Sequence, residues 1–242
     1  MYNNTTMLFF RKKKDIERPH KHISSQPLTL PELEAQIKKR VNNISKEILT
    51  GFEFIKDTPK TVTFFGSART LSSEKDYQDA YELSKEIAKL GYAIVTGGGP
   101  GIMEAANKGA YEVDGNSFGL TIKLPHEQIT NPYLSKEINF QYFFTRKVSL
   151  TYAAEAYVYF PGGFGTLDEL FEILTLVQTN KIDCVPIILF GSYFWKPLEE
   201  LIEKFLLENG KIDPQDMKLL KITDSIEEAL NIVKNAPIRN AH

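Results

Sequence analysis

Cysteine is almost absent from this sequence: Cys184 is the only one among 242 residues. A single cysteine can form neither an internal disulfide nor a thiolate metal cluster, so the composition gives no sign of an oxidising compartment. Cys184 stands at the start of an apolar run, and we expect it to lie in the core. The sequence therefore favours a protein of the reducing cytoplasm.

Long apolar runs and an excess of positive charge are also missing. The longest strongly apolar stretch, residues 184–190, is far shorter than the roughly 20 residues that span a bilayer. The 29 Lys and Arg residues nearly balance the 31 Asp and Glu residues, so the chain has no general field that attracts nucleic acid. We therefore expect no membrane and no nucleic acid among its partners, and a small molecule as its substrate.

Signals for metals and common cofactors are scarce as well. The four histidines form no cluster, and the acidic residues show no ion-loop spacing. One of these histidines, His126, lies in a long polar loop, and we expect it to be a loop or lid residue and not a metal ligand. Neither the dinucleotide pattern G-x-G-x-x-G nor a P-loop is present. The sequence therefore predicts no metal and no cofactor, and it leaves a monophosphate or a similar small anion as the expected ligand.

What is present, after Pro59, is a regular alternation of short apolar strands and longer helical segments. The predicted strands are residues 61–65, 92–96, 117–122, 156–160 and 185–190. The predicted helices are residues 73–90, 101–113, 143–154, 166–180, 193–208 and 225–234, with a long loop before residue 143. Apolar strands that alternate with helices are typical of a mostly parallel sheet covered on both faces. We therefore predict an α/β, Rossmann-like fold.

The chain before Pro59 has a different character. Residues 1–28 are polar and show no apolar period, so we predict a mobile tail. In residues 29–58, apolar side chains recur every three or four positions, which predicts one amphipathic helix that ends near Gly51. These side chains are Leu33, Ile37, Val41, Ile44 and Ile48. Residues 59–236 are expected to form a single catalytic domain.

Three glycine turns, at Gly66, Gly97 and Gly162, each follow a predicted strand. Ligands of such sheets bind at the carboxyl ends of the strands, so we expect the three turns to converge on one site. The turn at residues 161–166 precedes a helix, whose N-terminus offers free N–H groups and a positive dipole end to a phosphate. The alternative is that glycine only permits a tight turn there.

The acidic residues that follow this turn in the sequence, Asp168 and Glu169, also allow two interpretations. Thr166 at the N-cap with Glu169 three residues later is a capping box, which makes Glu169 structural, and taken alone this interpretation is favoured. The preceding glycine turn favours a functional carboxylate instead. Asp168 is ambiguous, because an acid in a first helical turn also favours the helix N-terminus electrostatically.

Four separated segments resemble the LOG ("lonely guy") family, the cytokinin riboside 5'-monophosphate phosphoribohydrolases. Pro161-Gly-Gly-Phe-Gly-Thr-Leu-Asp-Glu169 matches the family motif PGGxGTxxE. The other three are Phe65-Gly-Ser-Ala-Arg69, Thr96-Gly-Gly-Gly-Pro-Gly-Ile-Met103 and Phe144-Thr-Arg-Lys147. The similarity covers residues 60–234, and residues 116–120 and 124–128 look like the longer bacterial subgroup of the family.

The resemblance implies a reaction and a set of residues. The family hydrolyses the N-glycosidic bond of adenosine 5'-monophosphate (AMP) carrying an N6 substituent such as a prenyl group, and it forms homo-oligomers. It implies two catalytic residues: Glu169, which stabilises the oxocarbenium-like charge on the ribose, and Arg146, which orients the substrate and the carboxylate. The expected substrate-binding residues are Gly66, Ser67, Gly98, Gly99, Lys147, Gly162, Gly163, Phe164, Gly165 and Thr166. Weaker candidates are Arg69, Met103 and Asn107.

Two other functions stay open. One is a broader nucleosidase that acts on plain AMP or other nucleoside monophosphates in purine turnover. The other is a nucleotide-binding protein without turnover. Members of the LOG family were often labelled lysine decarboxylases, but no lysine here stands out as a Schiff-base residue for pyridoxal phosphate. Lys147 is the nearest candidate, and the resemblance assigns it to the nucleotide site.

Overall fold

The structure, a computed structural model, describes residues 28–58, 60–123 and 130–237. Contacts between residues divide the chain into two units, residues 1–40 and residues 41–242. In the first unit, the described residues 28–40 are exposed, and all but the first two belong to helix α1 (Leu30–Ile55). The predicted tail, up to residue 27, and His126 lie outside the described residues.

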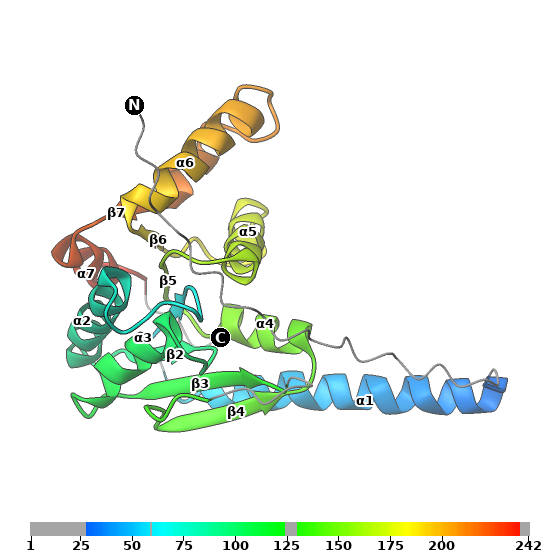
Figure 1. The fold of residues 1–242 in the computed structure, drawn as a ribbon. Helices are drawn as coiled ribbons and strands as arrows, with labels where there is room; N and C mark the ends of the chain where they lie inside the picture. The colour runs from blue at the N-terminus through cyan, green and yellow to red at the C-terminus, as the bar shows by residue number, and fades with distance from the viewer. Residues whose placement is uncertain (1–27, 59, 124–129, 238–242) are drawn as a thin grey trace, which may run out of the picture. The chain divides into compact units, whose positions relative to one another are not determined.

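Within the described part of the second unit, seven strands form one sheet in which all neighbours run parallel (Figure 1). They are β1 (Thr61–Phe65), β2 (Ala93–Thr96), β3 (Ser117–Ile122), β4 (Lys136–Phe140), β5 (Ala156–Tyr159), β6 (Ile187–Phe190) and β7 (Leu220–Thr223). The spatial order is β4-β3-β2-β1-β5-β6-β7. The chain therefore builds outward from β1 and then returns to start again at β5. This places the topological switch point, where such sheets bind ligands, between β1 and β5.

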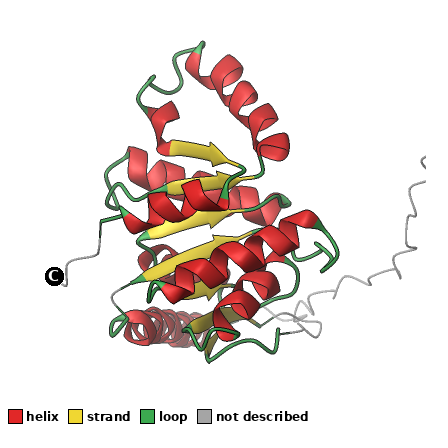
Figure 2. Ribbon diagram, turned by 90° about the vertical axis from the view of Figure 1, so that its left-hand side faces the viewer, coloured by secondary structure: helices red, strands yellow, loops and turns green. Residues whose placement is uncertain are grey.

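Helices cover both faces of this sheet, as Figure 2 shows. One face carries α2 (Lys75–Lys89), α3 (Ile102–Tyr111) and α7 (Ile226–Lys234), which pack on buried strand residues such as Phe64 and Val158. The opposite face carries the end of α1, α4 (Phe143–Tyr152), α5 (Phe164–Gln178) and α6 (Ser192–Ile202), which pack on residues such as Phe65 and Tyr159. A π-helix, Glu203–Leu207, continues α6, and a short 3-10 helix, Asp216–Leu219, precedes β7. The three layers confirm the predicted α/β, Rossmann-like fold.

The sequence does not reveal β4 and β7, which are the two edge strands. In β4, Phe140 is the one buried residue, so Lys136–Phe140 lacks the apolar run that marks a central strand. In β7, Leu220 and Thr223 are buried whereas Lys221 is exposed. Charged residues are common on edge strands, where they discourage pairing with a further chain. Neither segment therefore carries the apolar run by which the sequence reveals the central strands.

Two single-residue predictions are wrong. Cys184 is exposed, because β6 begins only at Ile187 and Cys184 belongs to the connection before it. Helix α1 does not end near Gly51 but continues to Ile55. A Cβ atom at Gly51 would lie 2.1 Å from the Oγ atom of Ser149, so glycine allows α1 to approach α4 closely within an unbroken helix.

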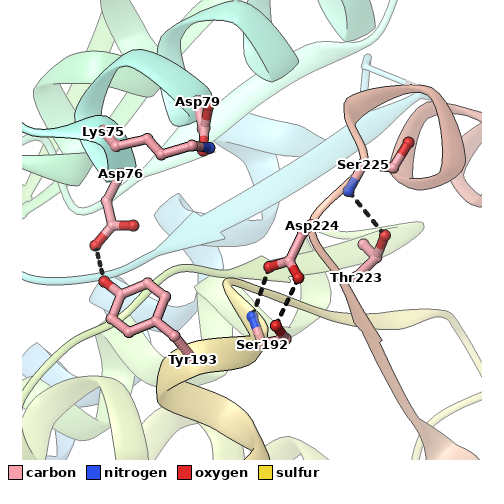
Figure 3. A network of polar contacts seen from close by, with 8 residues as sticks. All are labelled: Lys75, Asp76, Asp79, Ser192, Tyr193, Thr223, Asp224 and Ser225. Carbon is pink, nitrogen blue, oxygen red and sulfur yellow. Dashed lines mark hydrogen bonds and ion pairs between the residues drawn. The ribbon is translucent and has the colours of Figure 1, made fainter.

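A polar network fixes the start of α6 beside the end of β7 (Figure 3). The Asp224 carboxylate accepts hydrogen bonds from the Ser192 N–H group at 2.7 Å and from the Ser192 hydroxyl at 2.5 Å. The Tyr193 hydroxyl donates to Asp76, in the first turn of α2, at 2.5 Å. The network therefore holds the start of α6 to the end of β7 and to the first turn of α2.

Among the described residues, no helix has the length and hydrophobicity that crossing a membrane requires.

We predict that Gly51→Ala lowers the free energy of unfolding by about 1–3 kcal/mol, because its methyl group would overlap the Ser149 side chain. Urea denaturation measures this change. Gly165→Ala is the control, since a Cβ atom at Gly165 meets no other atom within 4 Å. An unchanged urea midpoint for Gly51→Ala would contradict the close packing of α1 on α4.

Candidate active site

The three glycine turns meet at the carboxyl edge of β2, β1 and β5, as the sequence predicts. The Ser67 N–H group donates to the Pro161 carbonyl at 3.0 Å, which joins the turn after β1 to the turn after β5. The Ser67 carbonyl accepts from the Ile102 N–H group at 3.0 Å, which joins the same turn to the start of α3. Gly101 has a φ of 71°, and a Cβ atom there would lie 2.3 Å from the Ser67 carbonyl oxygen. Backbone contacts therefore hold the turns together, and glycine is required at Gly101.

Helix α5 begins at Phe164, two residues before the predicted start. Thr166 is therefore the third residue of the helix, and the capping-box interpretation of Thr166 and Glu169 is wrong. The N-cap residue is Gly163, which has no side chain to cap the helix. The first three N–H groups of α5 have no acceptor among the described residues. These groups remain available to an anion.

The space around this turn differs from glycine to glycine. A Cβ atom at Gly162 would lie 2.1 Å from the Thr166 hydroxyl oxygen, so the Thr166 side chain packs directly against the turn. At Gly163 and Gly165 a Cβ atom would meet nothing within 4 Å. The Phe164 side chain is 93% exposed. A ligand can therefore approach the backbone of this turn, to which Phe164 contributes its N–H group.

Glu169 lies farther along α5, and its carboxylate is largely removed from water. Its side chain is 12% exposed, and its buried Oε2 atom accepts no hydrogen bond from the described residues. Burial raises the pKa of Glu169 to about 7, although the positive charges of Lys147 and Arg146 lower it. The Tyr159 hydroxyl donates to the Glu169 backbone carbonyl at 3.2 Å. The structure thus holds a carboxyl group that changes its charge near neutral pH.

Lys147, on α4, faces three carboxylates of α5. Its Nζ atom lies 2.6 Å from Asp168, 2.6 Å from Glu172 and 3.7 Å from the Oε2 atom of Glu169. Burial alone would lower the pKa of Lys147, but hydrogen bonds to Asp168 and Glu172 outweigh this effect and raise it. Glu172 is absent from the sequence prediction. Its spacing of three residues from Glu169 places both on one helix face, a signal that could have found it.

Arg146, the residue before Lys147, turns to the other side of the site. Its Nε atom donates to the Leu120 carbonyl of β3 at 2.6 Å, and its guanidinium group lies against Gly97, where a Cβ atom would be 2.0 Å from Nη2. Burial lowers the pKa of Arg146, and the charge of Glu169 opposes this shift. Arg146 is thus a half-buried cation beside the glycine turns, and not a residue of a surface salt bridge.

The turn after β2 is held from inside the fold. The Gly98 N–H group donates to the Thr96 hydroxyl at 2.8 Å, and the Asn131 side-chain amide donates to the Gly99 carbonyl at 3.0 Å. The same amide donates to Asn107 at 3.0 Å. Both asparagine side chains are buried, so Asn107 supports the turn from the core. Asn131 lies in the long stretch before residue 143 that shows no periodic pattern, so the sequence gives no sign that this residue supports the turn.

Two of the weaker candidates occupy different surroundings. The Sδ atom of Met103 would lie 2.9 Å from a Cβ atom on Gly97, so this side chain lines the turn after β2. Arg69 is exposed, and its backbone N–H group donates to the Ser67 hydroxyl at 3.0 Å. The structure therefore brings Met103 to the site and leaves the Arg69 side chain toward solvent.

Comparison with known proteins identifies the family of this chain. The sequence model of the family described as "Possible lysine decarboxylase" matches residues 103–233, which is more than half of the chain. The chain belongs to this family. The match includes Arg146, Lys147 and the whole turn from Pro161 to Glu169, and the resemblance to the LOG family is confirmed.

Relatives with assigned activities are similar over most of the chain. A cytokinin riboside 5'-monophosphate phosphoribohydrolase of Rhodococcoides fascians is 26% identical over 186 residues, 74% of this chain and 91% of the relative. A pyrimidine/purine nucleotide 5'-monophosphate nucleosidase of Escherichia coli (strain K12) is 28% identical over 181 residues, 69% of this chain but 39% of that protein. The molybdenum cofactor carrier protein of Chlamydomonas reinhardtii shares the fold, with a TM-score of 0.55 and 24% identity over 73% of this chain and 97% of that chain.

The family description raises the question of pyridoxal phosphate, the usual cofactor of amino acid decarboxylases. Such an enzyme needs a lysine that loses its proton and forms a Schiff base. Lys147 is bonded to carboxylates that raise its pKa, which stabilises the ammonium form. The Lys147 site therefore does not fit that cofactor.

We predict that Glu169→Gln stabilises the protein at pH 8 by up to about 3 kcal/mol. Above pH 7 the carboxyl group is ionised in the folded and the unfolded chain, and folding carries the full cost of burying its charge. As the pH falls from 7 to 4.5 the folded protein takes up a proton first, so the gain of the variant shrinks and then disappears.

Urea denaturation between pH 5 and pH 8 measures this difference, with Glu53→Gln, an exposed residue of α1, as the control. A gain that does not grow with pH would show that Glu169 has an ordinary pKa.

Proposed function

We propose that this protein hydrolyses the N-glycosidic bond of a nucleoside 5'-monophosphate and releases the free base and ribose 5-phosphate. The observation that carries the proposal is Glu169: a buried carboxylate with a pKa of about 7, flanked by Arg146 and Lys147 at the edge where three glycine turns meet. Perturbed carboxyl groups of this kind are typical of catalytic sites.

The turn from Gly162 to Thr166 is the proposed phosphate site. Its glycines leave the backbone open, and the first three N–H groups of α5 have no acceptor among the described residues. A phosphate group there would gain hydrogen bonds and the favourable end of the helix dipole. Binding energy from this remote group would then orient the scissile bond.

Glu169 is the proposed catalytic carboxylate. As the base departs, positive charge develops on the ribose ring, and an ionised carboxylate beside the ring stabilises that charge and helps to activate water. The proposed role of Arg146, whose Nε atom donates to the Leu120 carbonyl, is to orient the nucleotide. Lys147 keeps part of the Glu169 population ionised at neutral pH, because its charge lowers the pKa of Glu169.

The proposed substrate is AMP with a substituted N6 atom, as the relative from Rhodococcoides fascians is named for cytokinin riboside monophosphates. A second candidate, a nucleosidase of wider specificity, is favoured by the similarity to the Escherichia coli enzyme named for purine and pyrimidine nucleotides. Both use the same bond cleavage. The ratio of kcat/KM for N6-prenylated AMP and plain AMP separates them.

We predict that the purified protein releases ribose 5-phosphate from at least one nucleoside monophosphate, and that Glu169→Gln lowers kcat at least about 100-fold. The variant should still bind AMP in calorimetry, since the phosphate site does not include the Glu169 side chain. No release by the wild-type protein above the Glu169→Gln background, across a panel of monophosphates, would contradict the proposal. Binding of AMP without any product would favour the non-catalytic alternative.

We predict that kcat/KM rises with pH through a midpoint near 7, because Glu169 acts in its ionised form. Lys147→Met should move this midpoint to higher pH, since the lysine charge lowers the pKa of Glu169. The substrate phosphate titrates near pH 6 in every variant, so the shift between variants reports on Glu169. Lys46→Met, on an exposed residue of α1, is the control, and an equal midpoint in all three proteins would contradict the assignment.

A further inference from the structure

Helix α4 carries Arg146 and Lys147, yet it has no N-terminal cap of its own. Its N-cap residue, Tyr142, makes no side-chain capping hydrogen bond, and its first turn contains no acidic residue. The first turn of a helix leaves several N–H groups unpaired and frays easily without a cap. Arg146 is the fourth residue of α4, so fraying of this turn would reach it.

A carboxylate from another helix instead holds the two residues that lead into α4 and a side chain of its first turn. Glu47, on α1, accepts hydrogen bonds from the Gln141 N–H group at 2.9 Å, from the Tyr142 N–H group at 3.3 Å and from the Thr145 hydroxyl at 2.7 Å. Its negative charge also lies at the positive end of the α4 dipole. Thr145 is the residue directly before Arg146, so one of the three bonds is adjacent to the proposed catalytic residue.

A second contact fixes α1 against α4 one helical turn farther on. Gly51 follows Glu47 by four residues on α1, and Ser149 follows Thr145 by four residues on α4. No side chain fits between Gly51 and Ser149, where a Cβ atom would lie 2.1 Å from the Ser149 Oγ atom. The Phe52 ring also packs on the Tyr152 ring with a centroid distance of 4.4 Å. The close packing of α1 on α4 therefore fixes the position of the Glu47 carboxylate relative to the start of α4.

We propose that Glu47 is a positioning residue for the proposed hydrolysis, an inference that rests on the function proposed above. By fixing the first turn of α4, Glu47 lets Arg146 reach the Leu120 carbonyl and Gly97 while Lys147 reaches the carboxylates of α5. Glu47 precedes residues 103–233, the part that matches the family. The helix before the matched region thus contributes to the chemistry of the site.

The test compares Glu47→Ala with Glu53→Ala, an exposed residue of the same helix, in the release of ribose 5-phosphate from the best nucleoside monophosphate. Assays run well below the unfolding midpoint of each variant. We expect Glu47→Ala to lower kcat roughly 10-fold or more, because a small displacement of a catalytic group has a large effect on rate. KM should change less than about threefold, since none of the contacts described for Glu47 reaches the phosphate turn of α5.

A second pair of variants keeps Glu47 and tests one of its bonds. Thr145→Val removes the hydroxyl, whose acceptors are Glu47 at 2.7 Å and the Tyr142 carbonyl at 2.8 Å, and Thr145→Ser retains it. We expect the valine variant to lose activity and the serine variant to keep it. This pair decides the question if Glu47→Ala does not fold.

The outcomes separate this inference from the proposed function. Suppose that the wild-type protein is active. Equal kcat values for Glu47→Ala and Glu53→Ala, or for Thr145→Val and Thr145→Ser, then overturn the positioning role alone. A loss that appears in KM and leaves kcat unchanged also overturns it. A wild-type protein that releases no product overturns the proposed function and this inference together.

Discussion

The candidate site depends on keeping one carboxylate out of water next to two cations that do not neutralise it fully. Glu169 is buried on α5, the Lys147 ammonium stands 3.7 Å from its Oε2 atom, and no described donor bonds to that atom. Close hydrogen bonds would hold the carboxylate permanently ionised, and the absence of cations would keep it protonated. The observed arrangement leaves its pKa near 7. A group in this range can take part in catalysis at neutral pH, at a cost to stability.

The fold delivers this arrangement through the elements on either side of β5. Helix α4 precedes β5 and supplies Arg146 and Lys147, whereas α5 follows β5 and supplies the glycine turn and Glu169. Because β5 adjoins β1 at the switch point of the sheet, the turns after β1 and β2 lie against the same place. The site is thus assembled mainly by backbone geometry, with few side chains. This explains how a chain with nearly balanced charge can offer a site suited to an anion.

The central strands and the convergence of the glycine turns could be predicted from the sequence, because buried parallel strands are apolar throughout and their carboxyl ends meet at one edge. Edge strands β4 and β7 could not, since exposed positions need not be apolar. Family resemblance identifies the motif residues Arg146 and Glu169, and in the structure the charge of each shifts the pKa of the other. Glu172 shares a helix face with Glu169 and could have been found. Asn131 and Glu47 act through contacts between distant segments, for which the sequence has no local signal.

The chemistry proposed for this site requires the Glu169 carboxyl group to titrate near neutral pH. Carbon-13 NMR of protein labelled at glutamate carboxyl carbons measures this directly, with the Glu169→Gln spectrum identifying the resonance. We predict a midpoint of about 7 in the wild-type protein and a higher midpoint in Lys147→Met, because the charge of Lys147 lowers the pKa of Glu169. A midpoint near 4.5, the ordinary value for glutamate, would show that burial does not raise the pKa of Glu169.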